Sequence, residues 1–121
     1  MKYLCLAYYD EQAFEALPQA ELDAIVSQCP RYDQELRDSG HLILQASLGP
    51  TRATMSLRPK GGKPAVTDGP FAETKEQLAG FYLIDAKDFE EAIELAARIP
   101  PARLGSVEVR PVWTYDGRDA R

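Results

Sequence analysis

Runs of apolar residues recur along the chain, and the spacing within each run predicts the secondary structure. Residues 2–9 and 79–85 carry large apolar and aromatic side chains at successive positions, so both faces of these predicted strands need cover. Two further strands are predicted over residues 42–47 and 106–113, and in the second of these valine alternates with charged residues.

Residues 19–39 have the spacing of a helix. One apolar stripe runs along this segment and consists of Leu22, Ile25, Val26, Cys29, Tyr32 and Leu36. Pro30 lies inside the stripe and predicts either a kink near Ser27 or a division into two helices. A second helix is predicted over residues 89–98, with Asp88 as its N-cap.

Between the second strand and the strand at 79–85, the sequence predicts a strand over residues 52–58, a tight turn at 60–63 and a short edge strand at 64–66. The resulting order, β-α-β-β-(β)-β-α-β, is that of an α+β ferredoxin-like fold, a split βαβ arrangement with an antiparallel sheet. We expect a single domain over residues 1–113 and a C-terminal tail at 114–121.

Two helices can cover only one face of such a four- or five-stranded sheet. The strands at 2–9 and 79–85 are nevertheless apolar on both faces. A second copy of the chain is the simplest cover for the remaining face. The pattern therefore predicts a homodimer that forms through the sheet faces.

Composition narrows the classes of function. The 121 residues have a formal net charge of −5 and a pI near 4.9, which argues against direct binding of nucleic acid. No targeting segment and no membrane-spanning run is present, so a cytoplasmic location is expected. Cys5 and Cys29 are expected to be free thiols, and since no pair of residues has metal-ligand spacing, neither a metal nor another cofactor is predicted.

The stretch Val66–Glu76 concentrates ionisable side chains around a Gly-Pro bend and is the candidate functional site. Asp68 in this bend allows two interpretations. It can fix the turn by accepting backbone hydrogen bonds, or it can act as a general base or ligand-orienting carboxylate in a cleft. The aromatic walls of that cleft would come from Tyr8, Phe71 or Tyr82.

Glu73, Arg110 and His41 are three further residues whose roles can be interpreted from the sequence. Glu73 is either a solvated turn residue or shares a ligand site with Asp68. Arg110 either forms a cross-strand ion pair or binds an anionic ligand group in the dimer cleft. His41 is interpreted as an ordinary residue at the boundary between a helix and a strand.

Several longer stretches carry a family resemblance. They are Met1–Leu4, Val66–Glu76, Gly80–Ile84, Ala92–Pro101 and Gly105–Val112. On these stretches the chain resembles the DGPF-domain group of the YCII-related family. The resemblance implies a ferredoxin-like α+β domain that dimerises into an α/β barrel, in a family whose biochemical function is largely unassigned.

The resemblance also bears on the site. In shorter relatives a His–Asp pair has been suggested as catalytic, with its His in the early helical region. Residues 11–40 of this chain contain no His, and its only one is His41, so the pair does not carry over. The aspartate of the DGPF group matches Asp68. The frequent gene neighbourhood with extracytoplasmic-function sigma factors implies a sigma factor as a protein partner.

Two hypotheses about function follow. In the first, the chain is a small dimeric protein that binds a small-molecule ligand, or acts as an enzyme, at a cleft around Asp68. In the second, it is a non-enzymatic interaction module associated with transcription through an extracytoplasmic-function sigma factor. An enclosed cavity lined by Asp68 and aromatic side chains favours the first, and a packed centre with an exposed acidic patch favours the second.

Overall fold

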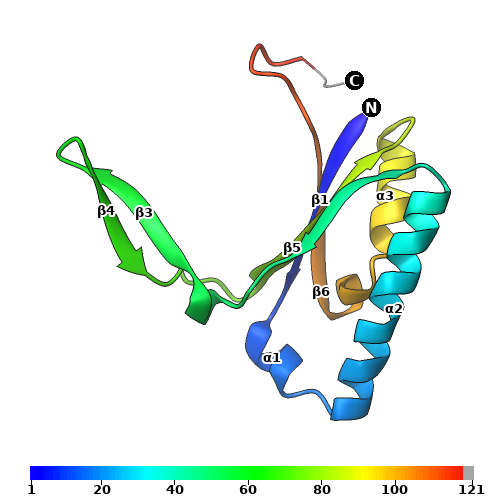
Figure 1. The fold of residues 1–121 in the computed structure, drawn as a ribbon, viewed down its shortest axis with the longest axis horizontal. Coiled ribbons are helices and arrows are strands. Elements are labelled where there is room, and N and C mark those ends of the chain that lie inside the picture. Colours follow the sequence, from blue (N-terminus) through cyan, green and yellow to red (C-terminus); the bar gives the residue numbers. More distant parts are fainter. Residues whose placement is uncertain (119–121) are drawn as a thin grey trace.

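A four-stranded antiparallel sheet in the order β2-β5-β1-β6 forms the centre of the computed structural model, which describes residues 1–118 (Figure 1). Its strands are β1 (Lys2–Tyr9), β2 (Leu42–Ser47), β5 (Gln77–Asp85) and β6 (Gly105–Pro111). All of them were predicted, with ends that differ by a few residues. The two central strands, β1 and β5, are the ones that the sequence marked as apolar on both faces.

Two helices, α2 (Gln19–Asp38) and α3 (Phe89–Ala97), lie on one face of the sheet, and neither covers the opposite face (Figure 1). The ferredoxin-like α+β fold class is thereby confirmed. Helix α2 is continuous through Pro30, so the predicted division into two helices does not occur. Pro30 is exposed, and its missing N–H removes only one backbone hydrogen bond from a long helix.

The core fills the space between the sheet and the two helices. Its buried apolar side chains are Tyr3, Cys5, Ala7, Tyr32, Leu36, Tyr82, Ile84, Ala86, Ala92, Ala96 and Ile99. On β1 and β5 these are alternate residues, as the pleat of a strand requires. The Tyr32 hydroxyl on α2 donates a hydrogen bond to the backbone oxygen of Leu95 on α3, which links the two helices across the core.

Short helical turns replace parts of the segments predicted as loop or strand. Helix α1 (Glu11–Glu15) was not predicted. Its N-cap is Asp10, whose Oδ1 accepts hydrogen bonds from two backbone N–H groups of the first turn, at 3.0 and 3.2 Å. The 3-10 turns η1 (Thr51–Ala53) and η2 (Pro100–Leu104) precede β3 and β6, and η1 occupies the start of the strand predicted over 52–58.

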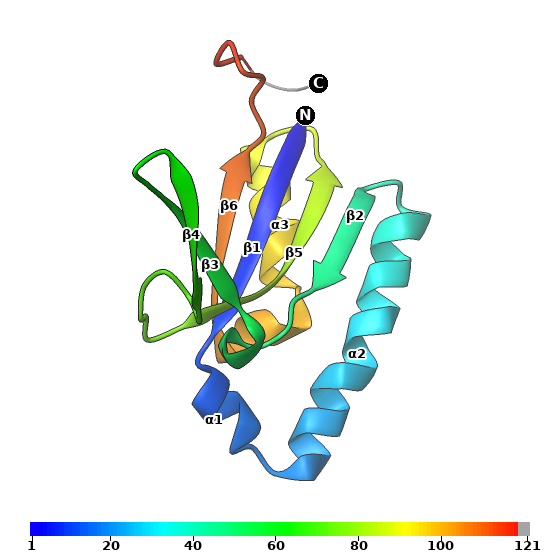
Figure 2. The same cartoon turned by 60° about the vertical axis from the view of Figure 1, so that its left-hand side comes forward.

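Strands β3 (Met55–Lys60) and β4 (Lys63–Asp68) form a two-stranded sheet of their own, so they do not add a fifth strand to the main sheet. The turn between them uses Gly61 and Gly62 with φ of 59° and 78°, values that glycine adopts without a steric penalty. Figure 2 shows this hairpin in front of the sheet, on the face that α2 and α3 leave open.

The segment after β6 closes into a turn, in which the N–H of Thr114 donates to the backbone oxygen of Arg118 at 2.6 Å. This turn is part of the tail predicted at 114–121. Residues 119–121 of that tail lie outside the described residues, and the domain boundary at residue 113 stays a prediction.

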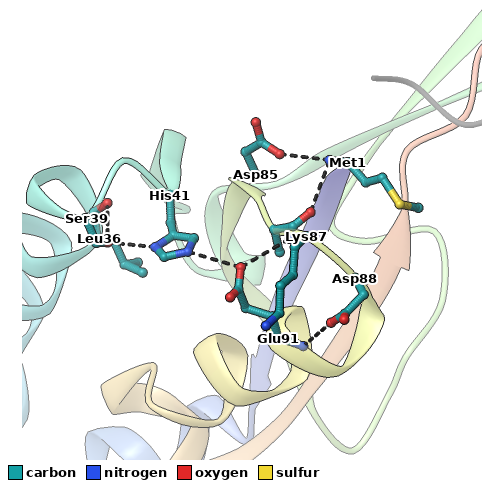
Figure 3. Close-up of polar contacts among 9 residues, drawn as sticks. Met1, Leu36, Ser39, His41, Asp85, Lys87, Asp88 and Glu91 are labelled. Atoms are coloured by element: carbon teal, nitrogen blue, oxygen red, sulfur yellow. Dashed lines mark hydrogen bonds and ion pairs between the residues drawn. The ribbon is translucent and has the colours of Figure 1, made fainter.

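A chain of polar contacts around His41 joins the end of α2 to the start of α3 (Figure 3). The His41 ring lies between Ser39 Oγ, 2.7 Å from Nδ1, and Glu91 Oε1, 3.2 Å from Nε2. Glu91 Oε1 also accepts a hydrogen bond from the N–H of Lys87 at 3.1 Å, and the Glu91 N–H donates to Asp88 Oδ1 at 2.8 Å. Asp88 and Glu91 form a capping-box arrangement for α3. His41 therefore connects the start of β2 to the cap of α3.

We expect His41→Ala and Glu91→Ala each to lower the free energy of unfolding by about 1 kcal/mol, because each removes a half-buried hydrogen-bonded pair. The double variant should lose less than the sum of the two single losses, since both changes remove the same contact. Urea unfolding followed by circular dichroism measures the three variants against the unaltered chain.

The matched control is Arg52→Gln, which removes the exposed ion pair between Arg52 and Glu15 at 2.8 Å. It should leave the urea midpoint unchanged, because exposed pairs are screened by water and salt. Fully additive losses for His41 and Glu91 would show that these two side chains do not stabilise the fold through each other.

Candidate functional site

A groove runs between α2 and the helical side of the sheet and encloses a cavity of about 580 Å³. Apolar side chains dominate its walls, among them Phe14, Ile25, Val26, Pro30 and Leu48. Tyr9 and Phe14 stack face to face there, with ring centroids 4.4 Å apart and planes within 2° of parallel. The groove therefore offers a flat aromatic wall and an apolar interior, as small-molecule sites commonly do.

One carboxylate is buried beside this groove. Asp33 on α2 is only 8% exposed, and its Oδ1 accepts a hydrogen bond from the Tyr82 hydroxyl at 2.5 Å. Tyr82 reaches it from β5, where it lies opposite Cys5 and therefore points to the helical side of the sheet. A long helix and a central strand thus hold the two partners in place from opposite walls.

The second carboxylate oxygen of Asp33 is open to the groove. The Asp33 side chain makes no hydrogen bond to a described residue other than the one to Tyr82. No side-chain oxygen among the described residues is both buried and unpartnered. Oδ2 is therefore not fully buried, and Asp33 itself lines the groove. A carboxylate in that position can accept a hydrogen bond or a proton from a bound molecule.

Electrostatics fix the protonation of two neighbours. Burial, followed by the hydrogen bond and the charge of Asp33, raises the pKa of Tyr82 well above its ordinary value. The phenol therefore keeps its proton and donates a hydrogen bond to Asp33. Burial, and then the charge of Asp33, also raises the pKa of Cys29 in the groove wall. Cys29 is therefore a neutral thiol at neutral pH, which does not suit a nucleophile.

The structure separates the residues that the sequence grouped into one cleft. Tyr82 lies at the groove with Asp33, whereas Tyr8 and Phe71 line a second cavity of about 890 Å³ on the open face of the sheet. Asp68 and Glu73 are exposed and line neither cavity. The predicted aromatic walls thus belong to two different places in the fold.

Asp68 is the last residue of β4, just before the Gly-Pro bend. Other residues hold the bend, since the Gly69 N–H donates to the backbone oxygen of Thr54 and Ser56 Oγ donates to the backbone oxygen of Gly69, both at 2.7 Å. Gly69 has a φ of 90°, which explains the glycine at this position. The Asp68 side chain accepts no hydrogen bond from residues 1–118, and a chemical role for it stays a prediction.

Arg110 lies on the open face of β6, opposite Leu4 of β1. Its Nε is 3.5 Å from Glu108 Oε2, an exposed ion pair within one strand. Burial, followed by the charge of Glu108, raises the pKa of Tyr8 on the neighbouring strand. The pair lies along β6 and not across the sheet as predicted, and anion binding by Arg110 stays a prediction.

Asp33 was not among the site residues predicted from the sequence. Its signal was present, because Asp33 follows Tyr32 directly and lies three residues before Leu36, at the edge of the apolar stripe of α2. An acidic residue in that position must either find a partner or stay neutral. The partner, Tyr82, is 49 residues away in the chain, so only the fold could identify it.

Two kinds of feature do not occur in the described part of the chain. Residues 1–118 contain no group of three or more His, Cys, Asp or Glu side chains placed to hold a metal ion. Within the same residues, no helix has both the length and the apolar character needed to cross a membrane.

Known proteins resemble this chain in sequence and in fold. A model of the YCII-related domain matches residues 1–116. The uncharacterized protein R00369 of Rhizobium meliloti (strain 1021) is 40% identical over 117 residues, which cover 95% of this chain and 94% of that protein.

Among solved structures, one neighbour is the 5-chloro-2-hydroxyhydroquinone dehydrochlorinase TftG of Burkholderia phenoliruptrix in complex with 2,5-dihydroxybenzoquinone. It aligns over 98% of this chain and 100% of its own, with a TM-score of 0.55 and 12% identity, so the likeness concerns the fold alone. The match to the family model and the 40% identity to R00369 establish that the chain belongs to the YCII-related domain family.

Proposed function

We propose that the chain binds a small organic molecule in the groove between α2 and the sheet, where Asp33 accepts a hydrogen bond or a proton from it. One observation carries the proposal: the buried Asp33 lines the cavity, its Oδ1 is held by Tyr82, and its Oδ2 has no hydrogen-bond partner among residues 1–118. Perturbed or buried titratable groups that line a cavity are the usual components of ligand and catalytic sites.

The shape of the groove supports this proposal. Its volume of about 580 Å³ lies within the ordinary range of small-molecule sites, and its walls combine apolar side chains with a few polar groups. TftG has the same fold and has been solved with a small planar ring compound. This likeness is an analogy at the level of the fold, and it adds that such a domain can hold a ligand of that size.

In this proposal Asp33 accepts the proton and Tyr82 orients the carboxylate. A proton that leaves an acidic C–H or O–H group of the ligand would form an O–H bond at Asp33 Oδ2, while the electron pair stays on the ligand. Tyr82 orients the carboxylate through its hydrogen bond to Oδ1. In the shorter relatives a His–Asp pair has been suggested for this work. Here no His lies between residues 11 and 40, and the buried aspartate is paired with a tyrosine instead.

The proposal moves the centre of the site from Asp68 to Asp33. Two cavities with aromatic walls support ligand binding over a fully packed centre, but neither is lined by Asp68, as the first hypothesis had expected. Chemistry at Asp68, the association with a sigma factor and the cytoplasmic location stay predictions.

The variant Asp33→Asn tests the site. Its amide oxygen can still accept from Tyr82, so the fold should persist, while the group that faces the cavity can no longer take up a proton. We expect binding of small hydroxylated ring compounds, with 2,5-dihydroxybenzoquinone as the first probe, to weaken by about tenfold or more, equivalent to about 1.4 kcal/mol. Thermal shift at several probe concentrations measures this loss.

Asp68→Asn is the matched control, because it makes the same chemical change at an exposed carboxylate outside both cavities. It should bind the probe as the unaltered chain does. If Asp68→Asn loses binding and Asp33→Asn keeps it, the site lies at the Gly-Pro bend and the assignment to the groove is wrong.

We also propose that the chain is a homodimer through the open face of its sheet. That face carries half-exposed apolar side chains from the central strands and from β2, namely Leu4, Leu6, Leu44, Ala46, Leu78, Phe81 and Leu83. A patch of this kind marks an interface in a water-soluble domain. Two-fold pairing of identical faces is the commonest way to cover it.

Sedimentation velocity at micromolar concentration should therefore show a dimer. The double variant Leu6→Lys and Leu83→Lys should be monomeric, because it places charges in the centre of the proposed interface. Ala24→Lys on the exposed side of α2 is the control and should stay dimeric. A stable monomer for the unaltered chain would contradict the proposal.

A further inference from the structure

The hairpin formed by Met55–Asp68, here called the arm, stands apart from the rest of the chain. Its strands β3 and β4 pair only with each other, outside the four-stranded sheet. Figure 1 shows the arm extending away from β1 and β5 on the side opposite α2 and α3. Isolated two-stranded hairpins are only marginally stable in water, so an arm of this kind needs a surface to pack on.

The two faces of the arm differ sharply in character. The register pairs Leu57 with Val66 and Pro59 with Pro64, and Met55 lies on the same face as these residues. Met55 and Leu57 are each 65% exposed. The other face carries the basic side chains of the arm, which are Arg58, Lys60 and Lys63. One face is thus mainly apolar and exposed to solvent, with Asp68 opposite Met55 at its end, and the other face is basic.

The sheet of the same protomer does not cover the apolar face. The cavity of about 890 Å³ lies between the arm and the open face of the sheet, with Met55 and Leu57 on one wall and Tyr8 and Leu78 on the other. Phe71, which follows the arm, borders this cavity and is 80% exposed. The cavity walls are mainly apolar, with polar side chains such as Arg58, Glu76 and Gln77 among them. The wall formed by Tyr8 and Leu78 belongs to the sheet face proposed as the dimer interface.

Charge indicates the kind of partner. Three of the arm's side chains are basic and one, Asp68, is acidic, whereas the whole chain has 14 basic and 19 acidic residues. The arm is therefore basic on an otherwise acidic protein. A second copy of this chain offers an apolar sheet face for Leu57 and Val66, and its net charge of −5 favours contact with a basic arm.

We propose that each arm packs on the second copy in the dimer, and that residues of this copy close the cavity bordered by Tyr8 and Phe71. The proposal rests on the homodimer proposed above and adds the element that holds its halves together. In the dimer, the apolar side of each arm leaves water, and the cavity at Tyr8 becomes a chamber with walls from both copies.

Photo-crosslinking tests where the arm lies. Leu57 is replaced with p-benzoylphenylalanine, the full-length protein is irradiated, and the products are separated on a denaturing gel. We expect a covalent band at twice the chain mass of 13.5 kDa, with a crosslinked peptide from the second copy identified by mass spectrometry. The same photoreactive residue at position 24, on the exposed side of α2, should give no such band.

Two double serine variants test how much the apolar face of the arm contributes to the stability of the dimer. Leu57→Ser combined with Val66→Ser should raise the dimer dissociation constant at least tenfold, since it removes apolar contacts from the arm. Ala65→Ser combined with Thr67→Ser changes the other face of the same hairpin and should leave the constant unchanged. Sedimentation equilibrium measures both.

The outcomes separate the two proposals. A dimer that crosslinks only within one chain, and that tolerates Leu57→Ser with Val66→Ser, would overturn the arm contact and leave the sheet-face dimer standing. A monomer would overturn both. Retention of double-stranded DNA that competes with the interchain crosslink would assign the basic face to nucleic acid and overturn the arm contact as well.

Discussion

The structure depends on a sheet that is apolar on both faces but covered by helices on only one. Both crossover helices, α2 and α3, pack on the same face of β1 and β5. Everything buried within one chain therefore lies on that face, including Asp33 and its partner Tyr82. The proposed dimer interface lies on the other face, where the hairpin β3–β4 also projects (Figure 2). The two proposed functions therefore use separate faces, ligand binding on one and association on the other.

The hydrogen bond between Tyr82 and Asp33 is an unusual element of the helical face. A buried carboxylate is costly unless it is hydrogen-bonded, and replacing such a pair by apolar side chains of similar size often leaves stability unchanged. Stability alone therefore does not account for an aspartate at this place on α2. Its position, with one oxygen held and the other open to a cavity, is the position that a proton acceptor or ligand anchor needs.

The sequence predicted the main strands, both long helices and the fold class, because periodicity reports which side of each element is buried. Helix α1 was not predicted, because it is a single short turn that depends on the cap from Asp10. The candidate site was harder to predict, because successive side chains of a strand point to opposite faces of the sheet and the sequence does not say which face is which. Tyr8 and Tyr82 face opposite sides of the sheet, and only the pairing of Cys5 with Tyr82 shows this. In the sequence, Asp33 has the appearance of an ordinary polar residue of an amphipathic helix. Only its partner Tyr82 on β5 shows that it is buried and hydrogen-bonded.

The prolines of the hairpin have a consequence for how copies of this chain can join. Pro59 and Pro64 lie opposite each other near the tip, and neither has a backbone N–H to offer. A free strand edge can pair with strands of other molecules, which leads to extended sheets and fibres. Here the prolines and the lysines beside them make the outer edges of the hairpin poor templates for strand addition. Association through this element is thus limited to its side chains, which favours a closed pair over an open polymer.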